Sequence, residues 1–406
     1  MKILWISQML VSDGRSSIGL TMYLEMPKWL ARGGHKILAF LGMQPTRLLR
    51  RFRPTSERSL RYLPMVNRPF LTTLSFQMCL ALALPMILLR FAPDVVIVDY
   101  FSVLTVGPLA LLHKLGILRC AFVLDVRTLP VDTKGWHGWI SERRFDLSLL
   151  LGKRLMDGMT VITPRMQETI AKRYAISPSE IGVWESGVDV EKFGEARSRR
   201  EELGWTDKFV VMYHGTLSPN RGLQAAVAAL AQLEQAYSDT RLVLLGAGEA
   251  TGELQALIVQ LGVGDMVKIL PPVPYAEVAA YVASADVGIV PLPDIEWWST
   301  SSPLKLMEYL AAGKPVIVSR IAAHTGVIGD NRCAYYLPVV SPEAIADGIR
   351  HFHARRNELA YLGGLGQEIV KNGYSWAIQA QRLANYLSNI VSNSPAYADK
   401  PGPNKE

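Results

Sequence analysis

The stretch SSPLKLMEYLAAGKPVIVS, residues 301–319, joins a short helical segment to a strand-like run. Ser302 is expected to cap the helix and Pro303 to be its first residue, so that Lys305 lies in the first turn. Gly313 and the proline two residues later end the helix, and the β-branched run VIVS follows. A short helix that leads directly into a buried strand indicates a parallel, helix-covered sheet.

The same alternation of strand-like and helical patterns extends along the whole chain. The strand-like runs of the first half are KILWIS, HKILAFL, DVVIVD, CAFVLDV and GMTVIT, and those of the second half are KFVVMYHG, TRLVLLGAG, MVKILP, ADVGIVPL and KPVIVS. The series restarts near Phe209 after the charge-rich segment EKFGEARSRREELGWTDK, which we interpret as the joint between two domains. The chain of 406 residues can bury two cores. The sequence therefore predicts an α/β protein with two doubly wound, Rossmann-like domains that face a cleft.

The expected domain boundaries follow from this pattern. We predict an N-terminal domain over residues 1–186 and a C-terminal domain over 187–372. A C-terminal helix over 373–391 is expected to pack back on the N-terminal domain, and residues 392–406, which lack an apolar period, are expected to be disordered. The three cysteines are far apart and form no C-x-x-C pair, which favours a reducing, cytoplasmic location. The N-terminal apolar run is too short for a secretory signal.

The positive charge is concentrated in one region of the N-terminal half. The net charge is +7, and residues 47–68 hold seven arginines, among them Arg47, Arg50, Arg51 and Arg53, against a single glutamate. The uncharged segment 69–89 follows, with a proline inside it. It is either a core helix beside a solvated arginine face or, together with 47–68, a surface that rests on anionic lipid; a true transmembrane helix is the weaker reading. No motif indicates binding to nucleic acid.

A nucleotide site is predicted at the carboxyl ends of the second series of strands. The first of these strands ends at His214 and Gly215, and Arg221 stands at the start of the next helix, where backbone N–H groups favour a phosphate. Lys305 in the first turn of its helix is electrostatically unfavourable unless an anion binds there. Glu308 shares its face, and a carboxylate can accept hydrogen bonds from both vicinal hydroxyls of a ribose.

A second candidate site follows a strand of the N-terminal half. Asp125 and Arg127 stand just beyond CAFVLDV. They form either a structural ion pair that closes a loop or a catalytic pair, in which Asp125 contacts or deprotonates an acceptor hydroxyl and Arg127 orients it; we favour the second reading. The chain contains no D-x-D pair, so no metal site is predicted.

Several segments resemble one family. SPLKLMEYLAAGKPVIVS resembles the donor-site signature of the retaining, GT-B fold glycosyltransferases called family 4 or group 1. LTMYLEMPKWLARGGHKI resembles their first helix and the turn after it, the Gly-Val-Asp that starts at Gly187 resembles the entry to their interdomain linker, and RLVLLGAGE resembles a strand of their second domain. The resemblance covers residues 1–390 and implies a GT-B architecture, with an acceptor-binding first domain and a donor-binding second domain.

The resemblance also implies a set of donor-binding residues. They are Gly19, His214, Gly215, Arg221, Thr300, Ser301, Leu304, Lys305 and Glu308, with Glu308 on the ribose. Thr300 stands where the family often has another glutamate, Thr216 where it has an arginine, and Arg221 where it has a lysine. Lys305 is expected to supply the second phosphate cation. The family's first loop has a pair of glycines, of which this sequence has only Gly19.

The predicted function is transfer of a sugar from a nucleoside diphosphate sugar, UDP- or GDP-linked, to a hydroxyl acceptor with retention of configuration. We expect a role in cell-surface polysaccharide or glycolipid synthesis, a lipid-linked acceptor, no cofactor, and a location in the cytoplasm or on the inner face of the plasma membrane. Two alternatives stay open: a nucleotide-sugar epimerase of similar fold, and a non-catalytic protein that binds sugar nucleotides.

Overall fold

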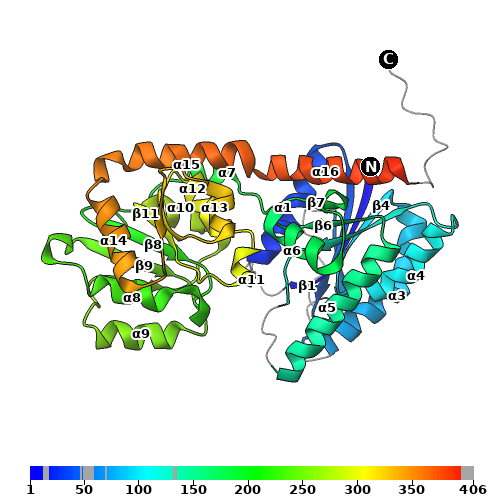
Figure 1. Cartoon of the computed structure of the whole chain (residues 1–406), viewed down its shortest axis with the longest axis horizontal. Helices are drawn as coiled ribbons and strands as arrows, with labels where there is room; N and C mark the ends of the chain where they lie inside the picture. Colours follow the sequence, from blue (N-terminus) through cyan, green and yellow to red (C-terminus); the bar gives the residue numbers. More distant parts are fainter. Residues whose placement is uncertain (12–17, 46–47, 49–58, 69–70, 131–134, 395–406) are drawn as a thin grey trace, which may run out of the picture. The chain divides into compact units, whose positions relative to one another are not determined.

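The chain forms two compact units, each built around a parallel sheet (Figure 1). The computed structural model describes residues 1–11, 18–45, 48, 59–68, 71–130 and 135–394. Unit 1 comprises Met1–Glu185 and the chain from Gln379 onward, and unit 2 is Ser186–Ile378. The division falls one residue before the boundary expected from the sequence. The charge-rich segment that we interpreted as the joint, residues 191–208, lies inside unit 2, where Arg200 forms an ion pair of 2.8 Å with Asp286.

Unit 1 contains a seven-stranded sheet of order β3-β2-β1-β4-β5-β6-β7 among its described residues. Its strands are β1 (Lys2–Val11), β2 (Lys36–Met43), β3 (Leu60–Pro64), β4 (Val95–Asp99), β5 (Ala121–Val126), β6 (Gly158–Val161) and β7 (Ile181–Val183). Its helices are α1 (Ile18–Arg32), α3 (Leu71–Phe91), α4 (Val103–Lys114), α5 (Gly135–Leu155), α6 (Pro164–Tyr174), the short η1 (Pro178–Glu180) and α16 (Trp376–Asn393), whose first turn belongs to unit 2.

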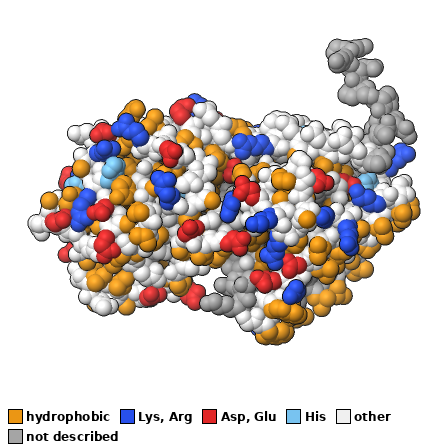
Figure 2. All heavy atoms as spheres, in the orientation of Figure 1, with side chains coloured by type: hydrophobic (Ala, Val, Ile, Leu, Met, Phe, Trp, Pro, Cys, Tyr) orange, Lys and Arg blue, Asp and Glu red, His pale blue; other side chains and the backbone are white. Residues whose placement is uncertain are grey.

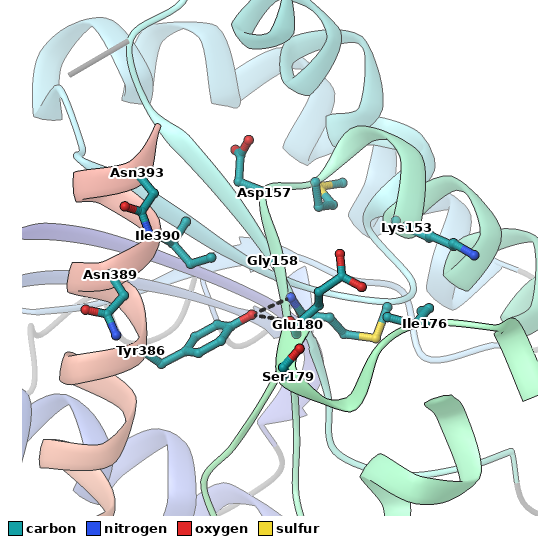
Figure 3. Close-up of a pocket in the computed structure, with 13 residues that line it drawn as sticks. Lys153, Asp157, Gly158, Ile176, Ser179, Glu180, Tyr386, Asn389, Ile390 and Asn393 are labelled. Carbon is teal, nitrogen blue, oxygen red and sulfur yellow. Dashed lines mark hydrogen bonds between the residues drawn. The ribbon is translucent and has the colours of Figure 1, made fainter. Parts of the chain in front are cut away.

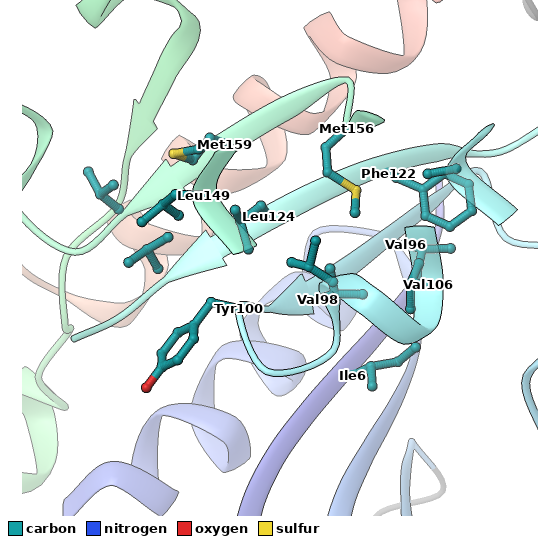
Figure 4. Close-up of a cluster of buried hydrophobic side chains, with 14 of the residues drawn as sticks. Ile6, Val96, Val98, Tyr100, Val106, Phe122, Leu124, Leu149, Met156 and Met159 are labelled. Atoms are coloured by element: carbon teal, nitrogen blue, oxygen red, sulfur yellow. The ribbon is translucent and has the colours of Figure 1, made fainter. Parts of the chain in front are cut away.

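The core of unit 1 follows from the two-residue period of its strands. In β1, Leu4 and Ile6 join the cluster beneath α3, α4, α5 and α6, while Ile3 and Trp5 are buried on the opposite face. Figure 4 shows part of this cluster, with side chains of β4 and β5 packed against those of α5. On the opposite face, the Trp5 ring lies 5.6 Å from that of Tyr23 on α1. Both faces of the sheet are thus covered by helices.

Helix α16 packs on the same unit as the first strands of the chain. A Cβ at Gly182 would lie 2.6 Å from the ring of Tyr386, so the missing side chain makes room for the helix. The Tyr386 hydroxyl accepts a hydrogen bond from the Met159 N–H at 3.0 Å and donates one to the Glu180 carbonyl at 2.8 Å. The helix runs past the end that we expected, to residue 393, and Ser394 is buried, so order extends into the predicted tail.

Unit 2 contains a six-stranded parallel sheet of order β10-β9-β8-β11-β12-β13. The strands are β8 (Phe209–His214), β9 (Thr240–Leu245), β10 (Val267–Leu270), β11 (Val287–Val290), β12 (Val316–Ser319) and β13 (Ala334–Leu337). The α-helices are α7 (Val190–Gly194), α8 (Leu223–Leu230), α9 (Thr251–Gln260), α10 (Tyr275–Ser284), α11 (Glu296–Ser299), α12 (Leu304–Ala311), α13 (Ala322–Ile328), α14 (Pro342–His353) and α15 (Leu359–Gly373), and the 3₁₀ turns are η2 (Pro219–Arg221), η3 (Gln235–Tyr237) and η4 (Arg356–Glu358).

Two large apolar clusters, with a smaller third one that contains residues of β8 and β9, cover the two faces of this sheet. One packs α8, α9 and α14 on β8, β9, β11 and β12, and the other packs α7, α10, α12 and α13 on β11 and β12. The central strands are buried along their whole length. This double coverage confirms the predicted doubly wound α/β class and brings the loops after β8 and β11 to one edge of the sheet.

Candidate functional site

The loop after β8 lies close to the loop after β11 because residue 222, where they meet, is a glycine. Gly222 has φ of +68°, and a Cβ on it would lie 2.1 Å from the Pro291 carbonyl oxygen, so a side chain there would push the two loops apart. Gly215, which follows β8 directly, donates its N–H to the Leu245 carbonyl at 2.9 Å, so this N–H extends the sheet. The close approach at Gly222 carries Arg221 toward the segment 291–304 that leads into α12.

Arg221 is positioned by polar and aromatic contacts of unit 2. Its Nε donates to the Ser218 hydroxyl at 2.8 Å, and its guanidinium carbon lies 4.7 Å from the centroid of the Trp298 ring. Trp298 in turn donates its indole N–H to the Asn220 carbonyl at 3.0 Å. The sequence did not single out Trp298, although the pair of tryptophans in WWSTSSP was visible there.

Lys305 lies in the first turn of α12, as predicted, but the cap of that helix differs from the prediction. The helix begins at Leu304 with Pro303 as its N-cap residue, and the hydroxyl of Ser302 accepts a hydrogen bond from the Ser186 N–H at 3.1 Å instead of capping. Ser302 therefore holds the start of unit 2 against the start of α12.

Lys305 and Arg221 form a pair of cations. Burial, together with the nearby charge of Arg221, lowers the pKa of Lys305 to about 7. Its Nζ lies 5.6 Å from the centroid of the Tyr213 ring. Within the described part of the chain, neither cation has a carboxylate at ion-pair distance. Two cations that repel each other at the end of a strand favour a bound anion.

Glu308 is completely buried one turn further along α12. Its Oε1 accepts a hydrogen bond from the Tyr275 hydroxyl at 2.7 Å, and its Oε2 lies 3.2 Å from Nε2 of His214. The second contact lacks hydrogen-bond geometry, so Oε2 and that ring nitrogen have no hydrogen-bond partner in the described chain. An unsatisfied buried carboxylate oxygen is costly and indicates a missing donor such as a ligand hydroxyl.

Burial dominates the charge state of this carboxylate and its neighbour. It raises the pKa of Glu308 to about 7, against the opposing hydrogen bond from Tyr275 and the charges of Lys305 and Lys192. Burial, with a contribution from Lys305, lowers the pKa of His214 to about 3, so the imidazole is neutral at physiological pH. Lys192 and Tyr275 support the carboxylate from α7 and α10, and the sequence reading missed both.

The remaining predicted donor residues play local structural roles or lie elsewhere. The Thr300 hydroxyl donates to the Glu296 carbonyl and the Ser301 hydroxyl to the Trp298 carbonyl, both at 2.8 Å, which closes α11. Leu304 is the buried first residue of α12. Gly19 stands in the first turn of α1 in unit 1, whereas the other predicted donor residues belong to unit 2.

In unit 1, Asp125 is buried and Arg127 is partly buried. Asp125 accepts a hydrogen bond from the Thr160 hydroxyl at 2.8 Å and lies 3.8 Å from the Arg127 guanidinium. Arg127 also donates to the Trp184 carbonyl at 2.8 Å and stacks on the Trp184 ring at 3.5 Å. Burial raises the pKa of Asp125 and outweighs the opposing charge of Arg127. These contacts fit a structural ion pair as well as a reactive carboxylate, so the catalytic role stays a prediction.

A pocket of about 450 Å³ opens elsewhere in unit 1 (Figure 3). It is lined by residues of α5, β6, η1 and α16, including Lys153, Asp157 and Tyr386. None of the residues predicted from the sequence to bind a ligand lines it. Apart from Gly19, the predicted donor-binding residues lie in unit 2, which remains the candidate ligand site.

Two family models match the chain. Residues 195–375 match the family model "Glycosyl transferases group 1", and residues 21–192 match the model "Glycosyltransferase Family 4".

Two curated relatives illustrate the sequence similarity. The chain is 28% identical over 212 residues to a GDP-mannose-dependent alpha-(1-6)-phosphatidylinositol monomannoside mannosyltransferase of Mycolicibacterium smegmatis. The matched region covers 50% of this chain and 54% of the relative. The chain is 26% identical over 256 residues to a D-inositol 3-phosphate glycosyltransferase of Corynebacterium glutamicum, covering 59% and 60%. The chain thus spans little more than half of the length of these relatives.

Solved structures share the fold over nearly the whole chain. Anabaena HepE in complex with UDP superposes with a TM-score of 0.71 at 18% identity, covering 96% of this chain and 100% of that one. The sucrose-phosphate synthase of Thermosynechococcus elongatus has a TM-score of 0.73 at 17% identity and covers 97% and 100%. With both halves matched by family models and the fold shared throughout, the chain belongs to the family 4, group 1 glycosyltransferases of the GT-B fold.

Proposed function

We propose that the protein transfers a sugar from a nucleoside diphosphate sugar to a hydroxyl acceptor with retention of configuration. The observation that carries this proposal is the cation pair of unit 2, Arg221 and Lys305. Neither has a carboxylate at ion-pair distance among the described residues, and Glu308 acts on Lys305 only from beyond that distance. Negative charge grows on the diphosphate as the glycosidic bond breaks. Two preorganised cations therefore stabilise the transition state more than the ground state.

The buried carboxylate beside this pair is our candidate for the group that binds the nucleoside. Glu308 Oε2 has no hydrogen-bond partner in the described chain, and Oε1 is oriented by Tyr275. A ribose hydroxyl that donates to Oε2 would satisfy this oxygen and leave His214 neutral beside it. In this arrangement Glu308 binds the ribose, and Arg221 and Lys305 bind the diphosphate.

Asp125 and Arg127 are our candidates for the acceptor side of the reaction. A carboxylate whose pKa is raised by burial, as that of Asp125 is, is closer to the pH range in which a general base acts. Arg127 holds it in place at 3.8 Å. Both roles are inferred from the sequence pattern and depend on the acceptor's reaching Asp125.

The donor and acceptor classes are proposed from the relatives. One relative is named for GDP-mannose and a phosphatidylinositol mannoside, and Anabaena HepE has been crystallised with UDP-glucose. We therefore propose a GDP- or UDP-sugar donor, a lipid-linked saccharide acceptor and a role in glycolipid or cell-surface polysaccharide synthesis. The matching location is the cytoplasm, with peripheral attachment to anionic lipid on the inner face of the plasma membrane through residues 47–89.

Nucleotide release measures this function directly. The chain is incubated with GDP-mannose, UDP-glucose and related donors, with and without lipid-linked and soluble saccharide acceptors. We expect acceptor-dependent release of the nucleoside diphosphate, a product that retains the anomeric configuration by NMR, and a kcat lowered by Arg221→Ala and by Lys305→Ala. Donor binding without turnover across the acceptor panel, or epimerised donor in the absence of acceptor, would overturn the proposal.

A further inference from the structure

The outer surface of α3 is apolar although it faces away from the core of unit 1. The buried row of this helix is Phe76, Leu80, Leu84 and Leu88, spaced four residues apart against the sheet. The exposed row is Leu71, Leu74, Met78, Leu82, Met86 and Leu89, with exposed fractions of 49 to 84%. The helix carries no charged residue before Arg90. The inner row packs in the buried cluster of unit 1, and among the described residues the outer row does not belong to that cluster.

The two neighbouring helices extend this surface. On α4, which packs beside α3, the exposed side chains Leu104 and Leu111 continue into Leu115 just after the helix. On α5 the exposed Trp136, Trp139, Leu147 and Leu150 follow helical spacing along one side. Figure 2 shows hydrophobic side chains gathered over these helices along the edge of unit 1.

The distribution of exposed apolar side chains between the units is uneven. Of the large hydrophobic side chains exposed in the described chain, seventeen lie in unit 1, all from residue 66 to 150, and five lie in unit 2. The units are of similar length. Scattered exposed leucines are ordinary on a protein surface, but a concentration over three adjacent helices indicates an interaction surface.

The charges and aromatic residues on this surface indicate what it contacts. Helices α3 and α4 contain no acidic residue, and their cationic residues, Arg90 and Lys114, lie in their last turns. On α5 the guanidinium of Arg143 lies 5.7 Å from the ring of the exposed Trp139. Leucine-rich faces edged by tryptophan and arginine are typical of helices that lie in the interface of a bilayer with anionic headgroups.

We propose that the outer faces of α3, α4 and α5 enter the boundary between the headgroups and acyl chains of an anionic bilayer. Helix α3 is long and apolar enough to cross a membrane by composition, but its buried row packs on the sheet of unit 1. It therefore lies on the bilayer. The inference builds on the proposed membrane attachment, names its surface and adds an apolar contribution that salt does not screen.

Vesicle sedimentation of the full chain tests this surface. The double variant Leu82→Glu/Leu89→Glu places two charges at positions that are 81% and 84% exposed, where they leave the core intact. We expect at least tenfold weaker partition onto phosphatidylglycerol–phosphatidylcholine vesicles, both at low salt and at about 0.5 M salt, where surface charges are screened. Val259→Glu on α9, also 81% exposed, is the matched control and should bind as wild type does. Equal thermal unfolding of the three proteins shows that folding is unaffected.

Tryptophan fluorescence provides a second readout. We expect a blue shift when wild type binds vesicles, and its loss or marked reduction in Trp136→Phe/Trp139→Phe. If Leu82→Glu/Leu89→Glu sediments like wild type, the outer face of α3 is not the membrane-binding surface, although membrane attachment itself stands. If wild type does not sediment with the vesicles, the proposed membrane attachment is wrong as well. A wild-type dimer that the same double variant converts to monomer would instead make this face an interface between two copies. Neither experiment contains a sugar donor, so both results are independent of glycosyl transfer.

Discussion

At the scale of single residues, the site in unit 2 is defined by ionisable groups that burial shifts toward their neutral forms. Lys305 and Glu308 both have a pKa of about 7, although their ordinary values lie six units apart. Near pH 7 each group is therefore only partly charged, although the charged form of each would attract the charged form of the other. A ligand with negative phosphates and hydrogen-bonding hydroxyls restores favourable partners to both, which makes protonation a sensitive reporter of binding.

Glu308 should make the stability of the protein fall with rising pH. The folded carboxyl keeps its proton up to about pH 7, whereas the unfolded one releases it near 4.5, so folding takes up a proton between these values. The free energy of unfolding should therefore fall by up to about 3 kcal/mol between about pH 5 and 8 through this group. Urea unfolding across this range should show a smaller fall for Glu308→Gln. Glu249→Gln, an exposed control, should follow wild type; an unchanged slope in Glu308→Gln would contradict the buried carboxyl's role.

Lys305 should take up a proton when a nucleoside diphosphate binds. With a pKa of about 7, the free amine is largely neutral at about pH 8, and a neighbouring diphosphate favours the ammonium form. Calorimetric titration with GDP and with UDP, in two buffers of different ionisation enthalpy, measures the protons bound. Lys305→Arg keeps a permanent charge, so it should bind nucleotide with less proton uptake. The same uptake in both proteins would mean that another group titrates.

At the scale of elements, the site depends on how closely the loops after β8 and β11 approach. That approach rests on a glycine with a left-handed backbone and no side chain, Gly222. The loop supplies Arg221, and the opposing segment supplies Trp298, which stacks on it. Changes in the loop should therefore affect ligand affinity more than they affect the sheet.

Gly222→Ala separates this effect from simple backbone strain. Gly204 has nearly the same φ, +67°, but a Cβ there would meet nothing within 4 Å. Both alanine variants should lose about 1 kcal/mol of stability because of the left-handed backbone. Only Gly222→Ala, whose Cβ would lie 2.1 Å from the Pro291 oxygen, should also weaken nucleotide binding, by roughly tenfold. Equal affinities in the two variants would show that the loop contact does not position Arg221.

At the scale of the whole molecule, the net charge of +7 and the cluster of arginines bear on membrane attachment. The arginines from 47 to 53 lie outside the described residues, so their contribution is argued from charge alone. Near an anionic surface each is worth about 1 kcal/mol, and salt screens this attraction.

Replacing Arg47, Arg50, Arg51 and Arg53 with glutamine should weaken binding to anionic vesicles at low salt. We expect wild type to bind anionic but not neutral vesicles and to lose most of its affinity as salt rises, whereas the variant should start weaker and change less. The salt-resistant remainder belongs to the apolar faces of α3, α4 and α5. If the variant had the same salt dependence as wild type, these arginines would not contribute to membrane binding.

The sequence by itself determined the doubly wound class and most of the sheet. The ten strand-like runs all became strands. Nine of them lie inside a sheet, where strands buried on both faces appear as continuous apolar runs, and the tenth, β10, lies at an edge. The strands that it missed, β3, β7 and β13, are all at sheet edges. Their sequences LRYLP, IGV and AYYL are short or mixed, because an edge strand contacts fewer neighbours.

The sequence also placed Lys305 in the first turn of a helix and Arg221 after a strand, since both follow from local spacing. Only the tertiary structure decided that Trp298 stacks on Arg221, that Tyr275 bonds Glu308, and that the pKa values of Lys305 and Glu308 meet near 7. It likewise decided that α3 is apolar on both sides, with only one side packed on the sheet. Contacts between residues distant in the chain, and the burial that shifts their charges, depend on how the helices and strands pack, which local periodicity does not encode.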